Sequence, residues 1–200
     1  MNFDIIYKDV TGSTNDDVWE LANHGAHAGV VVRALRQEAG YGQWKTRVWV
    51  SPEGGLYFSI LLQPRIPEEE FPSMSPRLAE AVARIVRQMA GVDQDAVWVK
   101  APNDVVCEAG KLCGMSLDAK DGKVVLGVGL NVFRPEGGIT TDGRNVAAYV
   151  SELGDDESRS LPLKHALANS LLRVQYIDAV MQGLLGAIDL ELSAIECEHM

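Results

Sequence analysis

KLCGMSLDAKDGKVVLGVGLNV, residues 111–132, carries the clearest signal of the fold. Asp121-Gly122 is a dipeptide typical of two-residue β-hairpin turns, and it stands between two runs rich in apolar residues. We therefore predict one strand over residues 111–118 and a second, almost entirely apolar strand over residues 123–132. The pair would form an antiparallel hairpin.

Further strands and helices are expected on both sides of this hairpin. Apolar patterning predicts strands at 30–32, 56–62, 97–100 and 105–107, the second with one buried face. Helical spacing and end signals predict helices from Ser13 to Gly25, between Pro76 and Gly91, and from Pro162 to about Leu185. Because hairpins occur and helices do not strictly alternate with strands, we predict an α+β fold with a mixed, largely antiparallel sheet flanked by helices.

The bulk properties of the chain limit its functions. With 200 residues and a formal net charge of -10, it is a poor candidate for binding nucleic acid or an anionic membrane. No apolar run reaches the ~20 residues of a membrane helix, and the N-terminus lacks the features of a secretory signal. Cys107, Cys113 and Cys197 form no Cys-x-x-Cys motif, which predicts buried, reduced thiols and no metal site. We expect one cytoplasmic domain, residues 1–200.

Two stretches in the N-terminal half could bind a ligand. Ser13-Thr14-Asn15 either caps a helix or presents hydroxyl and amide groups to a ligand at its N-terminus. The loop GYGQWKTRVW, residues 40–49, combines glycines that admit close backbone N–H contacts with Lys45 and Arg47, which could pair with phosphate. A Gly-rich surface hairpin is the alternative. The flat surfaces on which an adenine could stack are Tyr41, Trp44 and Trp49.

Two more stretches lie in the β-rich region. In Lys100-Ala101-Pro102-Asn103-Asp104, the lysine ends an apolar strand, where a buried ammonium needs an anionic partner; a solvated strand end is the alternative. In Gly127-Val128-Gly129-Leu130-Asn131, alternate glycines indicate either a bulge or a flat group lying against the sheet. Together the four stretches suit a carboxylate and ATP that form an acyl-adenylate, with Mg²⁺ on the departing pyrophosphate, followed by attack of an amine.

The motifs occur in a specific order. They are Ser13-Thr14-Asn15, Arg36-Gln37-Glu38-Ala39-Gly40, WVSPEGGLYFS at 49–59, Lys100 to Asp104, Lys111-Leu112-Cys113-Gly114-Met115, and Gly127 to Asn131. Over roughly residues 10–150 this set resembles the catalytic domain of biotin–protein ligases, in the biotin/lipoate ligase superfamily. The resemblance implies a class II aminoacyl-tRNA synthetase/biotin ligase-like fold. It also implies an ATP-dependent ligase that forms biotinyl-5′-AMP and transfers biotin to a lysine of a biotin carboxyl carrier domain.

The resemblance further implies roles for individual residues. Lys100 would be the catalytic lysine, in contact with the biotin carboxylate and the adenylate phosphate. The implied biotin-binding residues are Ser13, Thr14, Asn15, Gln37, Gly40, Tyr41, Gly42, Gln43, Gly114, Gly127, Gly129 and Leu130. The implied nucleotide-binding residues are Lys45, Arg47, Trp49, Asn103, Lys111 and Asn131. Biotin and ATP would be the substrates, Mg²⁺ would accompany ATP transiently, and many members of the family are homodimers.

The chain departs from the family pattern in the loop, whose family form is close to G-R-G-R-x-G-R-x-W. Tyr41 and Gln43 stand where arginines usually hold the carboxylate and phosphate, and Ala101 replaces a tryptophan. We expect neither the N-terminal helix-turn-helix of repressor-type ligases nor their small C-terminal β-barrel. Two alternatives stay open: a ligase for another carboxylate, such as lipoate or octanoate, and a non-catalytic biotin-binding pseudoligase.

Overall fold

A seven-stranded sheet forms the centre of the protein, whose computed structural model describes residues 1–43, 47–139 and 145–199. Its strand order is β1-β2-β3-β7-β6-β5-β4. Only β1 and β2 pair in parallel; the other neighbours are antiparallel, which confirms the mixed, largely antiparallel sheet. The strands are β1 Asp4–Thr11, β2 Val30–Gln37, β3 Leu56–Leu62, β4 Trp98–Lys100, β5 Asp104–Cys107, β6 Gly110–Lys120 and β7 Lys123–Leu130.

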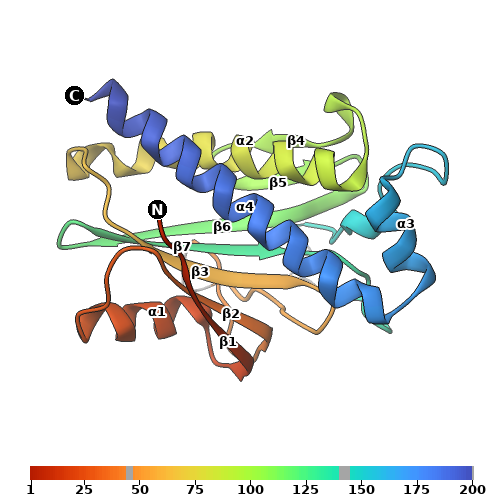
Figure 1. Cartoon of the computed structure of the whole chain (residues 1–200), viewed down its shortest axis with the longest axis horizontal. Helices are drawn as coiled ribbons and strands as arrows, with labels where there is room; N and C mark the ends of the chain where they lie inside the picture. The colour runs from red at the N-terminus through yellow and green to blue at the C-terminus, as the bar shows by residue number, and fades with distance from the viewer. Residues whose placement is uncertain (44–46, 140–144, 200) are drawn as a thin grey trace.

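Helices cover both faces of the sheet (Figure 1). Helix α1 lies on one face, where Val18 and Ala22 pack against buried side chains of β2, β3 and β7. Helices α2 and α4 lie together on the other face, over the main hydrophobic core. The helices are α1 Thr14–Asn23, α2 Phe71–Ala90, α3 Leu161–Ala168 and α4 Leu171–Glu198, with short 3-10 turns at Glu68–Glu70, Gln94–Ala96 and Val150–Glu152.

The hairpin predicted around Asp121-Gly122 forms between β6 and β7. Asp121 has φ 51° and Gly122 has φ 73°, the left-handed backbone that a two-residue type I′ turn requires at both central positions. Strand β6 is longer than expected and continues past β5, which pairs with it only as far as Gly114. This leaves a free edge on β6 from Met115 onward.

Several expected boundaries were wrong for physical reasons. Strand β3 is buried on both faces, not one, because α1 covers the side that carries Tyr57 and Ser59. Helix α2 begins at Phe71, ahead of Pro76, which sits inside it. The single helix expected from Pro162 is two, because Asn169 takes an extended conformation and its side chain accepts a hydrogen bond from the Leu171 N–H. Cys107 and Cys113 are buried as expected, but Cys197 is exposed.

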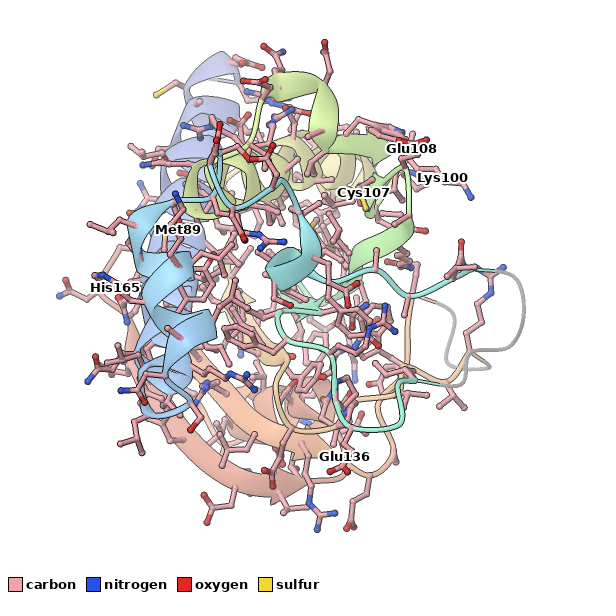
Figure 2. All side chains as sticks on the ribbon, turned by 90° about the vertical axis from the view of Figure 1, so that its right-hand side faces the viewer. Met89, Lys100, Cys107, Glu108, Glu136 and His165 are labelled. Atoms are coloured by element: carbon pink, nitrogen blue, oxygen red, sulfur yellow. The ribbon has the colours of Figure 1, made fainter. Side chains whose placement is uncertain are left out.

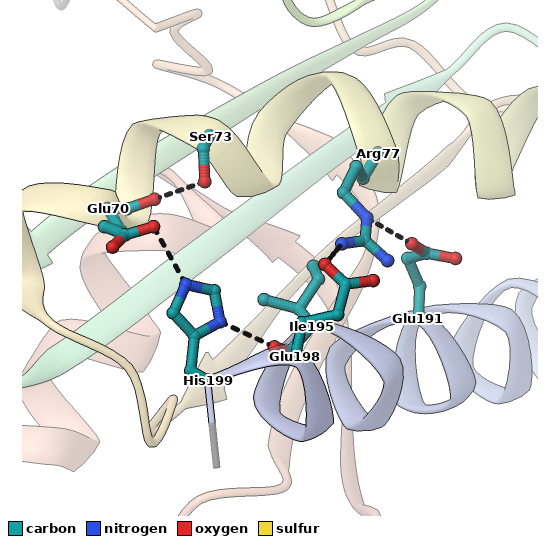
Figure 3. Close-up of polar contacts among 7 residues, drawn as sticks. All are labelled: Glu70, Ser73, Arg77, Glu191, Ile195, Glu198 and His199. Atoms are coloured by element: carbon teal, nitrogen blue, oxygen red, sulfur yellow. Dashed lines mark hydrogen bonds and ion pairs between the residues drawn. The ribbon is translucent and has the colours of Figure 1, made fainter.

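Ion pairs fix α4 onto α2 (Figure 3). The Arg77 guanidinium lies 2.6 Å from both Glu191 and Glu198. The His199 imidazole lies 2.8 Å from the carboxylate of Glu70. Although α4 has 28 residues, neither it nor any other helix in the described ranges is apolar enough over sufficient length to cross a membrane.

Candidate functional site

A cavity of about 800 Å³ lies against β6 and β7, between the N-terminus of α1, the loop that follows β2, and the turn between β4 and β5. It brings together most of the residues nominated from the sequence. Those that line it are Ser13, Thr14, Asn15, Gln37, Tyr41, Gly42, Gln43, Arg47, Trp49, Lys100, Asn103, Lys111, Gly114, Gly127, Gly129 and Asn131. Of the other nominated residues, Lys45 lies outside the described residues, and Gly40 and Leu130 are not part of the lining.

The first turn of α1 faces this cavity instead of being capped by its own side chains. Ser13 occupies the N-cap position, but its hydroxyl accepts no hydrogen bond from the helix. The backbone N–H of Thr14 donates to Oε1 of Gln37 over 2.8 Å, and Nε2 of Gln37 donates to Oγ of Ser51 over 2.8 Å. The capping explanation of this motif was therefore wrong, and Gln37 ties α1 to the loop after β2.

A chain of uncharged polar groups continues from Thr14 along the cavity wall. Oγ of Thr14 lies 2.7 Å from Oγ of Ser59, which donates to Oδ1 of Asn15 over 2.5 Å. Nδ2 of Asn15 then donates to Oγ of Ser116 over 3.0 Å. Because the one proton of Ser59 goes to Asn15, the hydroxyl of Thr14 is the donor of this pair. The same hydroxyl also donates to Oε1 of Gln37 over 3.1 Å, so its proton is shared between two acceptors. The proton of Ser116 has no acceptor among the described residues, so this wall presents hydrogen-bond donors to the cavity.

Ser51, Ser59 and Ser116 were not nominated from the sequence. Ser51 and Ser59 stand inside the motif at 49–59, and Ser116 directly follows the motif that begins at Lys111. Ser59 and Ser116 are buried, and each is hydrogen-bonded to Asn15. Their positions within or directly after these two motifs could have identified them as candidate site residues.

Of the two lysines that line the cavity, Lys111 is shielded and paired, whereas Lys100 is exposed. The ammonium of Lys111 lies 2.7 Å from the carboxylate of Asp104 and 5.2 Å from the centre of the Trp49 ring. The Lys111 side chain is only 17% exposed. Lys100 is exposed at the end of edge strand β4 and extends away from the body of the protein (Figure 2). The expectation of a buried, anion-paired Lys100 was wrong, because the strand that it ends lies at the edge of the sheet.

The glycines of β7 make room for side chains of the protein itself. A Cβ on Gly129 would lie 2.4 Å from Nε1 of Trp49, and one on Gly127 would lie 2.3 Å from Oδ1 of Asn15. Both glycines pair in regular register with β3 and β6, so the bulge alternative is wrong. The flat group against the sheet is the Trp49 indole, whose Nε1 is buried without a hydrogen-bond partner in the described part of the chain.

Leu130 and Gly40 were expected to bind biotin, but neither lines the cavity. Successive strand residues point to opposite faces, so Leu130 points away from the face that Gly129 clears and packs in the main core. Gly40 is buried beneath the loop, where a Cβ would lie 2.7 Å from the Trp49 carbonyl oxygen and 2.9 Å from Nε2 of Gln37.

Three nominated amide side chains bind the backbone of the protein. Gln43 donates to the carbonyl of Leu117 over 3.0 Å and accepts from its N–H over 2.8 Å. Asn103 donates through its side chain to the carbonyl of Met115 over 2.6 Å, and Asn131 donates to the carbonyl of Lys111 over 3.1 Å. These amides hold the walls of the cavity in place.

Two titrating groups near the cavity stay protonated. Burial, and then a hydrogen bond to Asp16, raise the pKa of Tyr41, whose hydroxyl donates to that carboxylate over 2.7 Å. Burial raises the pKa of the Cys113 thiol to about 12. A thiol so protonated at neutral pH is a poor nucleophile.

A cavity walled by uncharged donors and holding a paired lysine, on the face of a mixed sheet, has the form of a small-molecule site in an α+β domain. Residues 7–132 match the biotin/lipoate A/B protein ligase family. The chain belongs to this family.

Two relatives of the chain are named as ligases. The chain is 32% identical over 170 residues to the bifunctional ligase/repressor BirA of Bacillus subtilis, covering 82% of this chain and 51% of that protein. It is 31% identical over 165 residues to the biotin–[acetyl-CoA-carboxylase] ligase of Mycobacterium tuberculosis, with 82% and 59% covered. The chain thus spans about half the length of these relatives.

A solved structure confirms the fold. The biotin protein ligase from Aquifex aeolicus in complex with biotin and ATP aligns with a TM-score of 0.72 at 23% identity, over 96% of this chain and 72% of that one. The α+β, biotin ligase-like architecture expected from the sequence is therefore confirmed.

Proposed function

We propose that this chain provides the catalytic domain of an ATP-dependent biotin–protein ligase. A carboxylate oxygen of biotin attacks the α-phosphorus of ATP, which gives biotinyl-5′-AMP and releases pyrophosphate. The amine of an acceptor lysine then attacks the biotinyl carbonyl and AMP leaves. The observation that carries this proposal is one cavity that combines the uncharged donor wall of Asn15 and Ser116 with the paired ammonium of Lys111.

The donor wall favours biotin over the other acids considered. The free proton of Ser116, with the second amide protons of Asn15 and Gln37, would donate to the carbonyl oxygen of the ureido ring. Lipoate and octanoate carry no polar group at that end, and would leave these buried donors unpaired. An unpaired buried donor costs about 1–3 kcal/mol, which is enough to discriminate between substrates.

No cysteine among the described residues lines the cavity, so thioester chemistry of the octanoyl-transfer kind has no thiol nucleophile there. Cys113 lies in the motif beside Lys111, but its side chain belongs to the core and its thiol stays protonated. This supports the adenylate route over transfer through a cysteine.

Lys111 takes the catalytic role that we first expected of Lys100. In the proposed reaction, two negative groups, the biotin carboxylate and the α-phosphate, approach each other. The Lys111 ammonium, held by Asp104 and little exposed to water, would offset this charge as it builds up in the transition state. The Trp49 indole and the segment around Asn131 lie at the same end of the cavity and would receive the nucleotide.

The residues present fit a magnesium ion brought in by the nucleotide better than a resident metal. No group of three or more His, Cys, Asp or Glu side chains in the described ranges could hold a metal ion. Mg²⁺ commonly binds through substrate phosphates with few protein ligands. When bound with ATP, it would neutralise charge on the departing pyrophosphate.

The acceptor in this proposal is a lysine of a biotin carboxyl carrier domain, in line with the carboxylase in the name of the mycobacterial relative. The repressor activity in the name of the Bacillus relative is not part of the proposal. A net charge of -10 opposes association with the DNA backbone.

Pyrophosphate release tests the proposal. The protein is incubated with ATP and Mg²⁺, and with biotin, lipoate, octanoate or no acid. Release stimulated by biotin alone is the expected result. Release with lipoate or octanoate and not with biotin would identify that acid as the substrate. Calorimetric binding of biotin without any pyrophosphate release would establish the pseudoligase alternative.

A further inference from the structure

The free edge of β6 offers backbone groups that no strand pairs with. Beyond Gly114, strand β5 no longer accompanies β6, while β7 pairs along its other side. At Met115 both backbone groups on this edge bond to Asn103. The Met115 N–H donates to the Asn103 carbonyl over 3.0 Å, and the Asn103 side chain donates to the Met115 carbonyl. At Leu117 the edge is satisfied by Gln43.

Gln43 binds Leu117 in the way a neighbouring strand would. Its carboxamide both accepts from the N–H and donates to the C=O of the same residue, which is the reciprocal pattern of an antiparallel pair. An amide can make both bonds at once, whereas an arginine could only donate. The side chain therefore attaches the loop to the sheet through neutral groups.

The loop limb that carries Gln43 is bonded to the limb that carries Trp49. Tyr41 forms a bridge with Val48, the N–H of Gly42 donates to the Arg47 carbonyl over 3.0 Å, and the N–H of Trp49 donates to the Gly40 carbonyl over 2.8 Å. Because the Trp49 ring also lies on Gly129, a contact that holds Gln43 in place also holds this ring over the sheet.

We propose that Gln43 is a positioning residue that anchors the ligand-binding loop to the free edge of β6 and thereby slows release of the bound adenylate. The effect on release rests on the proposed function; the anchoring does not. Tyr41 forms a second anchor, through the hydrogen bond that its hydroxyl donates to Asp16 of α1. Since Gln43 is uncharged, its anchor needs neither the carboxylate nor the phosphate of a ligand.

Hydrogen exchange at Leu117 tests the anchor without any ligand. NMR follows the Leu117 amide in the wild type, in Gln43→Ala, in Gln43→Glu and in the control Gln182→Ala, which removes an exposed glutamine of α4. We expect about tenfold faster exchange in Gln43→Ala, the size of effect that two exposed hydrogen bonds provide. Gln43→Glu keeps the length of the side chain but cannot donate to the Leu117 carbonyl, so it should also exchange faster than the wild type.

Release of the adenylate tests the positioning role. Chemically prepared biotinyl-5′-AMP is bound, and its dissociation is followed by tryptophan fluorescence in the same four proteins. We expect dissociation about tenfold faster in Gln43→Ala than in the wild type or Gln182→Ala, with unchanged melting temperatures.

Each result decides a part of the proposal. Unchanged Leu117 exchange in Gln43→Ala would overturn the anchor. Faster exchange with unchanged release would overturn the positioning role. A wild type that does not bind biotinyl-5′-AMP would refute the proposed function and with it the effect on release, while Leu117 exchange would still confirm or refute the anchor.

Discussion

The ammonium of Lys111 lies 2.7 Å from the carboxylate of Asp104, and both side chains are mostly shielded from water, at 17% and 19% exposure. The two residues come from neighbouring strands, β6 and β5, and meet on the face that the cavity occupies. A charge held this way keeps its position as a ligand arrives, so it can stabilise charge that develops during a reaction.

Lys111→Ala should remove most adenylate formation. Loss of a preorganised charge of this kind lowers kcat by about 10²–10³-fold. Lys100→Ala should change the rate by less than about threefold, because an exposed charge at a strand end is screened by solvent. Rates of biotin-dependent pyrophosphate release in the two variants, with circular dichroism as a check on folding, make the comparison. A larger loss in Lys100→Ala than in Lys111→Ala would restore the role first expected of Lys100.

Gly129→Ala should displace the Trp49 ring. The new Cβ would lie 2.4 Å from Nε1 of the indole, and the ring must move because the strand is held on both sides. We expect a red shift of tryptophan emission and at least tenfold weaker nucleotide binding, about 1.4 kcal/mol. Gly12→Ala is the control, since its Cβ would meet nothing within 4 Å. Identical emission spectra in both variants would show that the ring does not rest on Gly129 in solution.

Ser59→Ala should both destabilise the protein and weaken biotin binding. It leaves Oδ1 of Asn15 and the hydroxyl of Thr14 without their shared partner in a buried site. The expected loss is about 1–3 kcal/mol in the free energy of unfolding, measured by urea denaturation. Ser193→Ala, on the exposed side of α4, should have little effect. Equal stability of the two variants would mean that water replaces the missing hydroxyl.

The contact between His199 and Glu70 should make stability depend on pH. Hydrogen bonds to the Ile195 carbonyl and to Glu70 raise the pKa of His199 above 6.5. A raised folded-state pKa adds stability that is fully present below the unfolded value and is lost as pH rises through the folded value. The difference in melting temperature between the wild type and His199→Gln should therefore be largest below pH 6.5 and shrink as the pH rises above that value. A difference that grows with pH would contradict the pairing.

The parts of the fold that depend on local chemistry could be predicted from the sequence. Asp121-Gly122 specifies its turn because the backbone there needs positive φ at both positions. The strand period also placed Gly127 and Gly129 on one face. The same alternation places Leu130 on the opposite face, in the main core, although the family resemblance implied that it binds biotin.

The parts of the site that depend on the order of the strands in the sheet could not be predicted. Lys100 and Lys111 each adjoin apolar strands in the sequence, and only the strand order shows that β4 is the edge. Gln43 and Asn103 bond to the backbone of β6 because β6 extends beyond the end of its pairing with β5. No sequence motif indicates this difference in strand length. Both side-chain amides were predicted to contact a ligand, and both form hydrogen bonds with the backbone of β6.

Mass spectrometry of the small-molecule product shows whether the cavity that holds Lys111 forms biotinyl-5′-AMP. The wild type, Lys111→Ala and Lys100→Ala are each incubated with ATP, Mg²⁺ and an equal mixture of biotin, lipoate and octanoate. We expect biotinyl-5′-AMP as the main adenylate from the wild type and from Lys100→Ala, and almost none from Lys111→Ala. Lipoyl- or octanoyl-AMP in its place, or no adenylate from the wild type, would contradict the proposed function.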